Sequence, residues 1–265
     1  MTSSATILPP IFAVCGDVRS TSLRTITLKV SRKRGEGGTK MCGRYTLSTP
    51  IGTLAEEFDI AEPLPELQPN YNVAPTQEVP AVLAGNGGGE RRLEMLRWGL
   101  IPSWADDPGI GARMINARSE TVAEKPSFRR AFKDRRCLIP ADGFYEWQKT
   151  KGGKQPHYIW MKNGRPFAFA GLWESWKGDG NEIRSCTILT TNPNDLAREV
   201  HNRMPVILPP EDHDLWLDPD AHEPDLLLPL LRPYPAGDMQ AYPVSRKANK
   251  PSNNEPAALN VWPDR

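Results

Sequence analysis

Breaks in regular structure recur along the chain, whose 265 residues include 27 prolines and 21 glycines. Proline removes an amide donor, and glycine lacks the side chain that restricts the backbone, so both residue types interrupt helices. The apolar segments between these breaks are short, and none approaches the roughly 20 residues that a membrane-spanning helix requires. The pattern excludes a helical bundle and predicts short elements joined by many turns.

Most of the short apolar segments have the composition of β-strands. They lie close together in sequence and do not alternate regularly with helices, so a doubly wound parallel sheet is not expected. We predict one α+β domain in which a mostly antiparallel sheet curls into a barrel flanked by short helices. Strands are expected over residues 79–83, 93–98, 137–139, 144–147, 157–161, 167–171 and 185–189.

Helical segments are few. Pro50 follows Ser48 and Thr49 and predicts the first turn of an N-capped helix whose apolar residues continue to Phe58. Further short helices are expected over residues 196–200, 212–217 and 225–231, the first of them capped by residues 192–195 and followed by His201.

The first 40 residues differ in composition from the rest. They hold seven basic and two acidic residues, which leaves 26 basic and 30 acidic residues, or a net charge of −4, for residues 41–265. We expect residues 1–40 to be an extension that is disordered, untranslated or removed, residues 41–250 to form the functional domain, and residues 251–265 to form a C-terminal tail. Met41 directly precedes Cys42 and favours an internal start, although a transit peptide and a propeptide stay open as alternatives.

Charge and cysteine content limit the function classes. A net negative domain has no general affinity for nucleic acid, so DNA contact requires a local basic groove. The four cysteines are too sparse for a disulfide framework, lack the spacing of zinc ligands and fit a reducing, cytoplasmic setting. There is also no Gly-rich phosphate loop, so neither a cofactor nor a metal is expected. The cysteines are Cys15, Cys42, Cys137 and Cys186.

Six segments combine polar, aromatic and turn-forming residues in a distinctive order. They are residues 41–45 (Met-Cys-Gly-Arg-Tyr), 71–76 (Tyr-Asn-Val-Ala-Pro-Thr), 98–104 (Trp-Gly-Leu-Ile-Pro-Ser-Trp), 115–121 (Ile-Asn-Ala-Arg-Ser-Glu-Thr), 141–147 (Ala-Asp-Gly-Phe-Tyr-Glu-Trp) and 201–206 (His-Asn-Arg-Met-Pro-Val). In this order the chain resembles the SOS response-associated peptidase (SRAP) family of abasic-site processing proteins. The resemblance extends from Met41 to about Asn249 and implies the SRAP-type fold.

The resemblance implies a covalent function for Cys42. In that family the initiator methionine is removed, and the exposed cysteine reacts with the ring-opened aldehyde of an abasic site in single-stranded DNA. Such a residue suits an aldehyde, because its α-amine has a reference pKa near 8 and its thiol can close a five-membered thiazolidine ring. The family name adds a peptidase that would cleave the bond preceding Cys42.

The resemblance also implies the partners of Cys42. Asn116 would orient the amino terminus or the sugar, Glu146 would move protons during dehydration of the carbinolamine, and His201 would protonate the opening sugar ring oxygen. Taken alone, each of the three also fits a plain structural role: a turn former, an exposed strand residue and a helix C-terminal cap.

Binding of the DNA would depend on basic and aromatic side chains within the same segments. Arg44 and Arg118 match family positions that contact phosphates. Trp98 and Trp104 offer rings on which bases could stack, at about 1–3 kcal/mol per contact in other proteins. Core packing is the alternative for Trp98.

Two other functions stay open. One is a cysteine peptidase that uses Cys42 and His201 on other proteins, and the other is a non-covalent reader of modified bases. Thiazolidine chemistry requires a terminal cysteine, whereas a peptidase acting in trans does not. We expect a monomer that is associated with the nucleoid, has single-stranded DNA carrying abasic sites as its partner and makes no membrane contact.

Overall fold

The computed structural model describes residues 43–85, 89–178 and 180–262. Cys15 and Cys42 lie outside the described residues, as do residues 86–88 of the loop between the first two expected strands of the barrel. In the described ranges no helix is long and apolar enough to cross a membrane.

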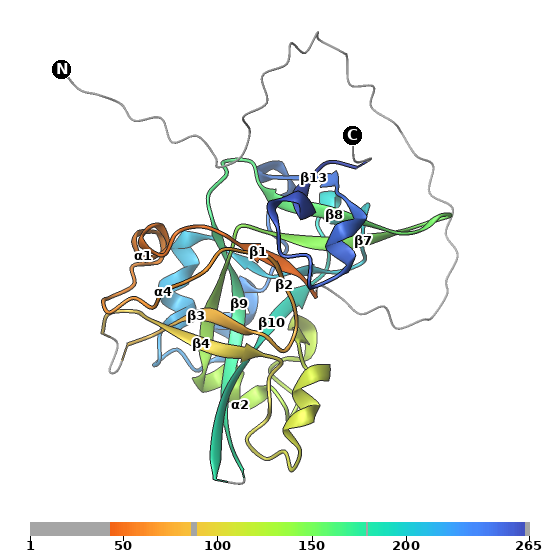
Figure 1. Cartoon of the computed structure of the whole chain (residues 1–265). Coiled ribbons are helices and arrows are strands. Elements are labelled where there is room, and N and C mark those ends of the chain that lie inside the picture. The colour runs from red at the N-terminus through yellow and green to blue at the C-terminus, as the bar shows by residue number, and fades with distance from the viewer. Residues whose placement is uncertain (1–42, 86–88, 179, 263–265) are drawn as a thin grey trace, which may run out of the picture. The chain divides into compact units, whose positions relative to one another are not determined.

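Five strands close into a barrel (Figure 1). They are β3 (Glu78–Leu83), β4 (Arg92–Trp98), β6 (Arg136–Ala141), β9 (Phe167–Gly178) and β10 (Asn181–Thr191). Pairing follows the order β10-β4-β3-β6-β9, and β9 pairs with β10 to close the ring. Every pair is antiparallel except β4 with β10, which run parallel. The predicted mostly antiparallel, barrel-like sheet is therefore confirmed.

Side chains from all five barrel strands enter one apolar core. Val82, Leu96, Leu138, Phe169 and Ile188 are each at most 2% exposed, and each comes from a different strand. Closure leaves the barrel without a free strand edge along the ring, which protects its amides from pairing with other chains.

A second, antiparallel sheet has the order β13-β8-β7-β1-β2. Its strands are β1 (Tyr45–Leu47), β2 (Asn70–Val73), β7 (Gly143–Thr150), β8 (Gly153–Met161) and β13 (Met239–Pro243). Aromatic rings join it to the barrel, since Tyr45 and Phe144 lie edge-on to Phe169 with centroid distances of 5.7 and 6.1 Å. Barrel and sheet thus share one core.

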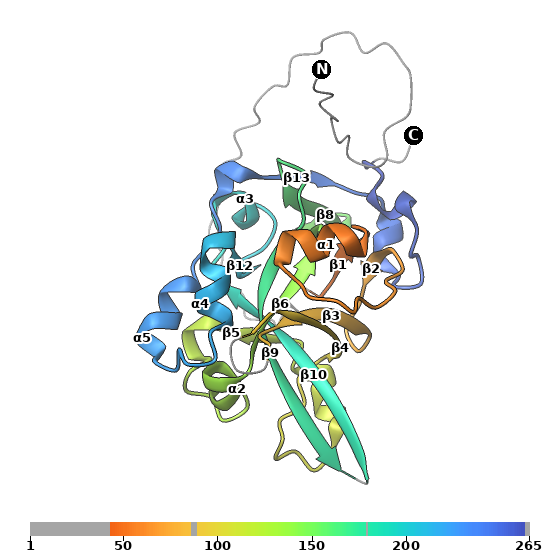
Figure 2. The same cartoon turned by 90° about the vertical axis from the view of Figure 1, so that its left-hand side faces the viewer.

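Short helices flank the strands (Figure 2). They are α1 (Ile51–Phe58), α2 (Arg129–Asp134), α3 (Asp195–Arg198), α4 (His213–Leu217) and α5 (Pro224–Leu227), with the short strands β5 (Asn116–Arg118), β11 (Met204–Pro205) and β12 (Ile207–Leu208) between them. The expected cap of α3 is confirmed, because the Asn194 side chain accepts a hydrogen bond from the Ala197 amide at 2.8 Å.

The predicted side-chain cap of α1 is wrong. Pro50 occupies the cap position, and no side chain bonds to the first turn. Ser48 and Thr49 instead donate their hydroxyls to the Asp142 carboxylate at 2.8 and 2.6 Å. A carboxylate is the stronger acceptor, so these hydroxyls fasten the start of α1 to the turn between β6 and β7.

Residues 251–262 fold back onto the second sheet. A 3-10 helix at Pro256–Leu259 buries Ala258, which is 1% exposed. Val261 bridges to Val244 just after β13. The described part of the expected tail therefore packs against the domain.

Candidate functional site

Asn116 and Arg118 lie on β5, which runs parallel along the end of β10. Asn116 pairs with Ile188, and Arg118 pairs with Thr190. Because side chains alternate along a strand, these two residues share one face while Ala117 enters the core at 1% exposure. Asn116 is half-buried, and Arg118 is exposed.

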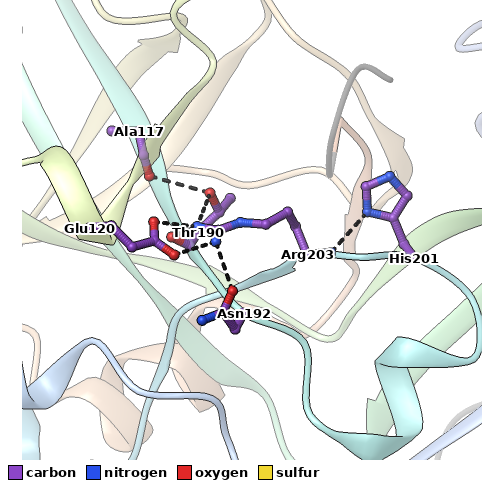
Figure 3. A network of polar contacts seen from close by, with 6 residues as sticks. All are labelled: Ala117, Glu120, Thr190, Asn192, His201 and Arg203. Atoms are coloured by element: carbon purple, nitrogen blue, oxygen red, sulfur yellow. Dashed lines mark hydrogen bonds and ion pairs between the residues drawn. The ribbon is translucent and has the colours of Figure 1, made fainter. Parts of the chain in front are cut away.

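His201 and Arg203 lie on the opposite side of β10, directly before β11. Thr190 is the shared neighbour, since it pairs with Pro205 of β11 as well as with Arg118 of β5. The Arg203 amide donates to Nδ1 of His201 at 3.2 Å (Figure 3). An accepting Nδ1 carries no proton, so the neutral imidazole carries its proton on Nε2.

The Arg203 guanidinium ties the two flanking strands together. It donates to both carboxylate oxygens of Glu120, at 2.9 Å for the Nη2–Oε2 pair, and to the Thr190 carbonyl at 2.7 Å. Arg203 is only 9% exposed, and its hydrogen bonds hold the pKa of Glu120 below the usual range. A bidentate pair of this kind fixes geometry as well as charge. The segments that carry Asn116 and His201 are thus held in one arrangement (Figure 3).

Glu146 lies on β7 and is 2% exposed. Gln148, two residues further along and on the same face, donates from Nε2 to the Glu199 carbonyl at 2.9 Å. That contact brings β7 beside the segment that ends in His201. Glu146 is therefore buried, and the plain alternative of an exposed strand residue does not apply to it.

A second histidine lies opposite Glu146. His157 on β8 is its antiparallel partner, and burial lowers the pKa of that imidazole. The sequence gives no reason to single out His157, because only the register of the β7–β8 hairpin brings it to Glu146. Glu120 and Arg203 were also missed as a pair, although both lie within the distinctive segments.

The start of β1 leads directly to Glu146. Tyr45 pairs with Phe144, and the Tyr145 amide donates to the Arg44 carbonyl at 3.0 Å. Gly43 precedes β1, and one further step in this antiparallel register would bring it opposite Glu146. Gly43 is the first described residue and follows Cys42 in the sequence.

Arg44 is half-buried, and one nitrogen of its guanidinium is held by the protein. Its half-buried Nη1 donates to Asn72 Oδ1 at 2.9 Å and to the Ala248 carbonyl at 3.2 Å. Desolvation by burial lowers the pKa of Arg44. Asn72 in turn donates to the carbonyls of Lys250 and Asn253 at 2.9 and 3.1 Å. Hydrogen bonds of Arg44 and Asn72 thereby hold the start of β1 against residues 248–253.

The two tryptophans have different environments. Trp98 is 1% exposed, donates from Nε1 to the Ile115 carbonyl at 2.9 Å and lies edge-on to Tyr45. Core packing, the alternative for Trp98, is what the structure shows, and no face of this ring is open to a base. Trp104 is 58% exposed in the loop after β4 and can receive a stacked base.

The two other described cysteines are buried, and one cavity lies apart from the expected site residues. Cys137 and Cys186 are both 0% exposed, and burial raises the pKa of each thiol, which makes both poor nucleophiles. A cavity of about 370 Å³ opens beside β1 and β3, between Leu47, Val79 and Met95. None of the expected site residues lines it.

Comparison with known proteins identifies the family. Residues 41–251 match the family described as SOS response associated peptidase (SRAP). The abasic site processing protein YoqW of Bacillus subtilis (strain 168) is 50% identical over 223 residues, which cover 83% of this chain and 99% of that protein. The abasic site processing protein HMCES of Xenopus tropicalis is 32% identical over 72% of this chain and 66% of its own.

A solved structure agrees with this assignment. A crystal structure of a protein from Bacteroides thetaiotaomicron superposes with a TM-score of 0.76 at 28% identity, covering 83% of this chain and 99% of that one. The chain therefore belongs to the SOS response associated peptidase family.

Proposed function

We propose that the protein senses abasic sites in single-stranded DNA and captures them covalently through Cys42 as its N-terminal residue, in the response to DNA damage. The observation that carries this proposal is the pairing of Tyr45 with Phe144, because this register, continued to the residue after Cys42, leads to the buried Glu146. The relatives that are 50% identical are named abasic site processing proteins.

Capture needs no cofactor and no redox step. The α-amine of Cys42 adds to the C1′ aldehyde of the open sugar, and the resulting carbinolamine loses its oxygen as water to give an imine. The thiol then adds to the imine carbon, and its proton passes to the nitrogen. One C–N bond and one C–S bond form, and one water leaves. The product is a thiazolidine.

The neighbouring groups would supply the proton transfers. His201 would give the Nε2 proton to the sugar ring oxygen as the ring opens. Glu146, beside Gly43, would carry protons to and from the carbinolamine oxygen. Asn116 would orient the amine or the sugar from β5. Arg118 and Trp104, both exposed, would hold the adjacent phosphate and base.

The same thiol would release the extension in a second activity. Its sulfur would attack the carbonyl carbon of Met41, the bond to the Cys42 nitrogen would break, and water would hydrolyse the thioester. This step frees both nucleophiles of Cys42.

A peptidase acting on other proteins and a non-covalent reader stay the alternatives. We also propose that the protein acts as a monomer and that it works on DNA in the cytoplasm or nucleoid.

The test is a denaturing gel of protein starting at Met41, mixed with single-stranded DNA that carries one abasic site. A band that resists heat and detergent is expected with abasic DNA alone. The same band with intact DNA, or no band with either, would sink the proposal. Covalent attachment is the readout because a non-covalent reader gives none.

Arg118→Ala and Arg44→Ala should differ in effect. Arg118 is exposed, so its loss should leave the melting temperature unchanged and lower the salt slope of single-strand binding by about 0.7. Arg44→Ala leaves the buried acceptors of Asn72 and Ala248 without this donor, at a cost of about 1–3 kcal/mol of stability. Calorimetry and salt titration measure both. An unchanged salt slope in Arg118→Ala removes that residue from the DNA site.

Arg203→Lys should slow capture without preventing DNA binding. A lysine keeps the positive charge, but its single ammonium group cannot form the bidentate pair with Glu120 and also bond to the Thr190 carbonyl. The segment that carries His201 should therefore shift. We expect a single-turnover crosslinking rate about tenfold lower. The pH profile of the rate should also move, while affinity for DNA stays within about twofold. An unchanged profile with a lower melting temperature would assign Arg203 a structural role alone.

A further inference from the structure

Most lysines of the domain gather on one surface. Nine lysines follow Met41 in the sequence, and five of them lie on the tip of the β7–β8 hairpin or on the 3-10 helix η7 (Arg246–Asn249) and the residue after it. This is a strong concentration in a region whose net charge is −4. We call it the hairpin surface, and its six exposed cations are Lys149, Lys151, Lys154, Arg246, Lys247 and Lys250.

Direct contacts hold the two parts of the hairpin surface together. Arg246 donates from Nη2 to the Gly152 carbonyl in the hairpin turn at 3.4 Å. Trp147 of β7 donates from Nε1 to Asn249 Oδ1 at 2.7 Å. Figure 1 shows β7 and β8 projecting together as a ribbon beyond β13. The cations therefore form one surface and not two separate clusters.

The described residues do not neutralise the charge of the hairpin surface. None of its six cations makes an ion pair with a described residue. Exposed cations elsewhere do, such as Arg165 with Glu57 and Arg232 with Asp212. Six like charges side by side repel one another, and an anionic polymer would relieve that repulsion.

The hairpin surface adjoins the candidate site. Lys149 follows Glu146 by three residues on β7, which is about 10 Å at roughly 3.3 Å per strand residue, and its side chain lies on the opposite face of the strand. Arg44, two residues after Cys42, donates to the Ala248 carbonyl within η7. A single strand that leaves the site would reach these cations by passing around β7, whose described pairing with β1 ends before Glu146.

We propose that the hairpin surface binds the phosphate backbone of the lesion-carrying strand on one side of the lesion. This inference rests on the proposed function and adds a second region of contact to it. Affinity then depends on the length of the single strand, because a short oligonucleotide fills the site without reaching the hairpin.

The test uses protein starting at Met41, as in the capture test, and oligonucleotides that carry a tetrahydrofuran abasic analogue. The analogue has no aldehyde, so binding stays non-covalent and is measured by fluorescence anisotropy over a range of salt. The variant is Lys149→Ala/Lys151→Ala/Lys154→Ala. The matched control, Lys125→Ala/Lys133→Ala/Lys177→Ala, removes the same charge from exposed positions elsewhere. Melting temperatures check that both fold.

With a 25-nucleotide strand, the hairpin variant should bind about tenfold more weakly at low salt, and its salt slope should fall by about 2, or roughly 0.7 per lost phosphate contact. With a strand of about seven nucleotides centred on the analogue, both variants should stay within about twofold of the wild type. Strands extended on the 5′ or the 3′ side alone should show the loss for one polarity.

Several results would overturn the inference. They are an unchanged slope in the hairpin variant, an equal loss in the control, and equal losses with both polarities. Equally tight binding of poly-glutamate that the variant also loses would assign the surface to an acidic protein. If true abasic DNA crosslinks to the wild type while the slope is unchanged, only this inference fails. If crosslinking is absent but the slope falls, only the proposed function fails.

Discussion

Cys42→Ser is expected to abolish the heat-stable adduct between the protein and abasic DNA. A serine keeps the α-amine, so an imine can still form with the aldehyde. Its hydroxyl is a far weaker nucleophile than a thiol near neutral pH, so the ring that stabilises the adduct does not close. Borohydride should therefore trap a residual imine that otherwise reverses. Denaturing gels with and without borohydride measure both species.

The other described cysteines provide the control. Cys137→Ser and Cys186→Ser should crosslink at the wild-type rate, since both thiols are 0% exposed and burial raises the pKa of each. Neither can supply an α-amine. Loss of the adduct in either variant, with an unchanged melting temperature, would contradict Cys42 as the sole nucleophile.

The second large effect concerns residues 1–41. In the 265-residue chain the nitrogen of Cys42 is an amide, whose lone pair is delocalised into the Met41 carbonyl. Such a nitrogen does not add to an aldehyde at a useful rate, so the uncleaved chain should give no stable adduct. Mass spectrometry of the active protein should find Cys42 as its first residue. Full-rate crosslinking by a chain that retains Met41 would refute the thiazolidine mechanism.

A cleavage-blocked chain separates this chemistry from self-processing. Cys42→Ala in the 265-residue chain removes the thiol that would attack Met41, so that chain should keep its extension. If residues 1–41 are missing from this variant as often as from the wild type, either another peptidase removes them or translation starts at Met41.

Local sequence patterns predicted the strands well and their closure only in outline. Apolar β-rich segments such as 79–83 and 137–139 became β3 and β6, because burial of alternating side chains decides these positions locally. The parallel pairing of β4 with β10 joins Trp98 to Cys186 across 88 positions, and no turn signal links such strands. The predicted cap of α1 was wrong for a similar reason, since the Ser48 hydroxyl bonds to Asp142, which lies 94 residues away.

The site shows the same division between local and distant contacts. The resemblance of the motifs pointed to Asn116, Glu146 and His201, but only the structure shows Glu146 buried and His201 accepting at Nδ1. The Glu120–Arg203 pair spans 83 residues, and the partners of Arg44 lie 28 and 204 residues away. The partners of a charged residue cannot be predicted from the sequence when they lie far from it along the chain.

The tie from Arg44 and Asn72 to residues 248–253 sets an order of events during synthesis. Arg44 emerges from the ribosome well before the carbonyl of Ala248, which lies 204 residues later in the chain, and before those of Lys250 and Asn253. Removal of the residues before Cys42 by a cellular enzyme can therefore precede assembly of the site, while self-cleavage must follow it. A nascent chain arrested before residue 248 should consequently carry a cysteine with only the reactivity of a free amino acid.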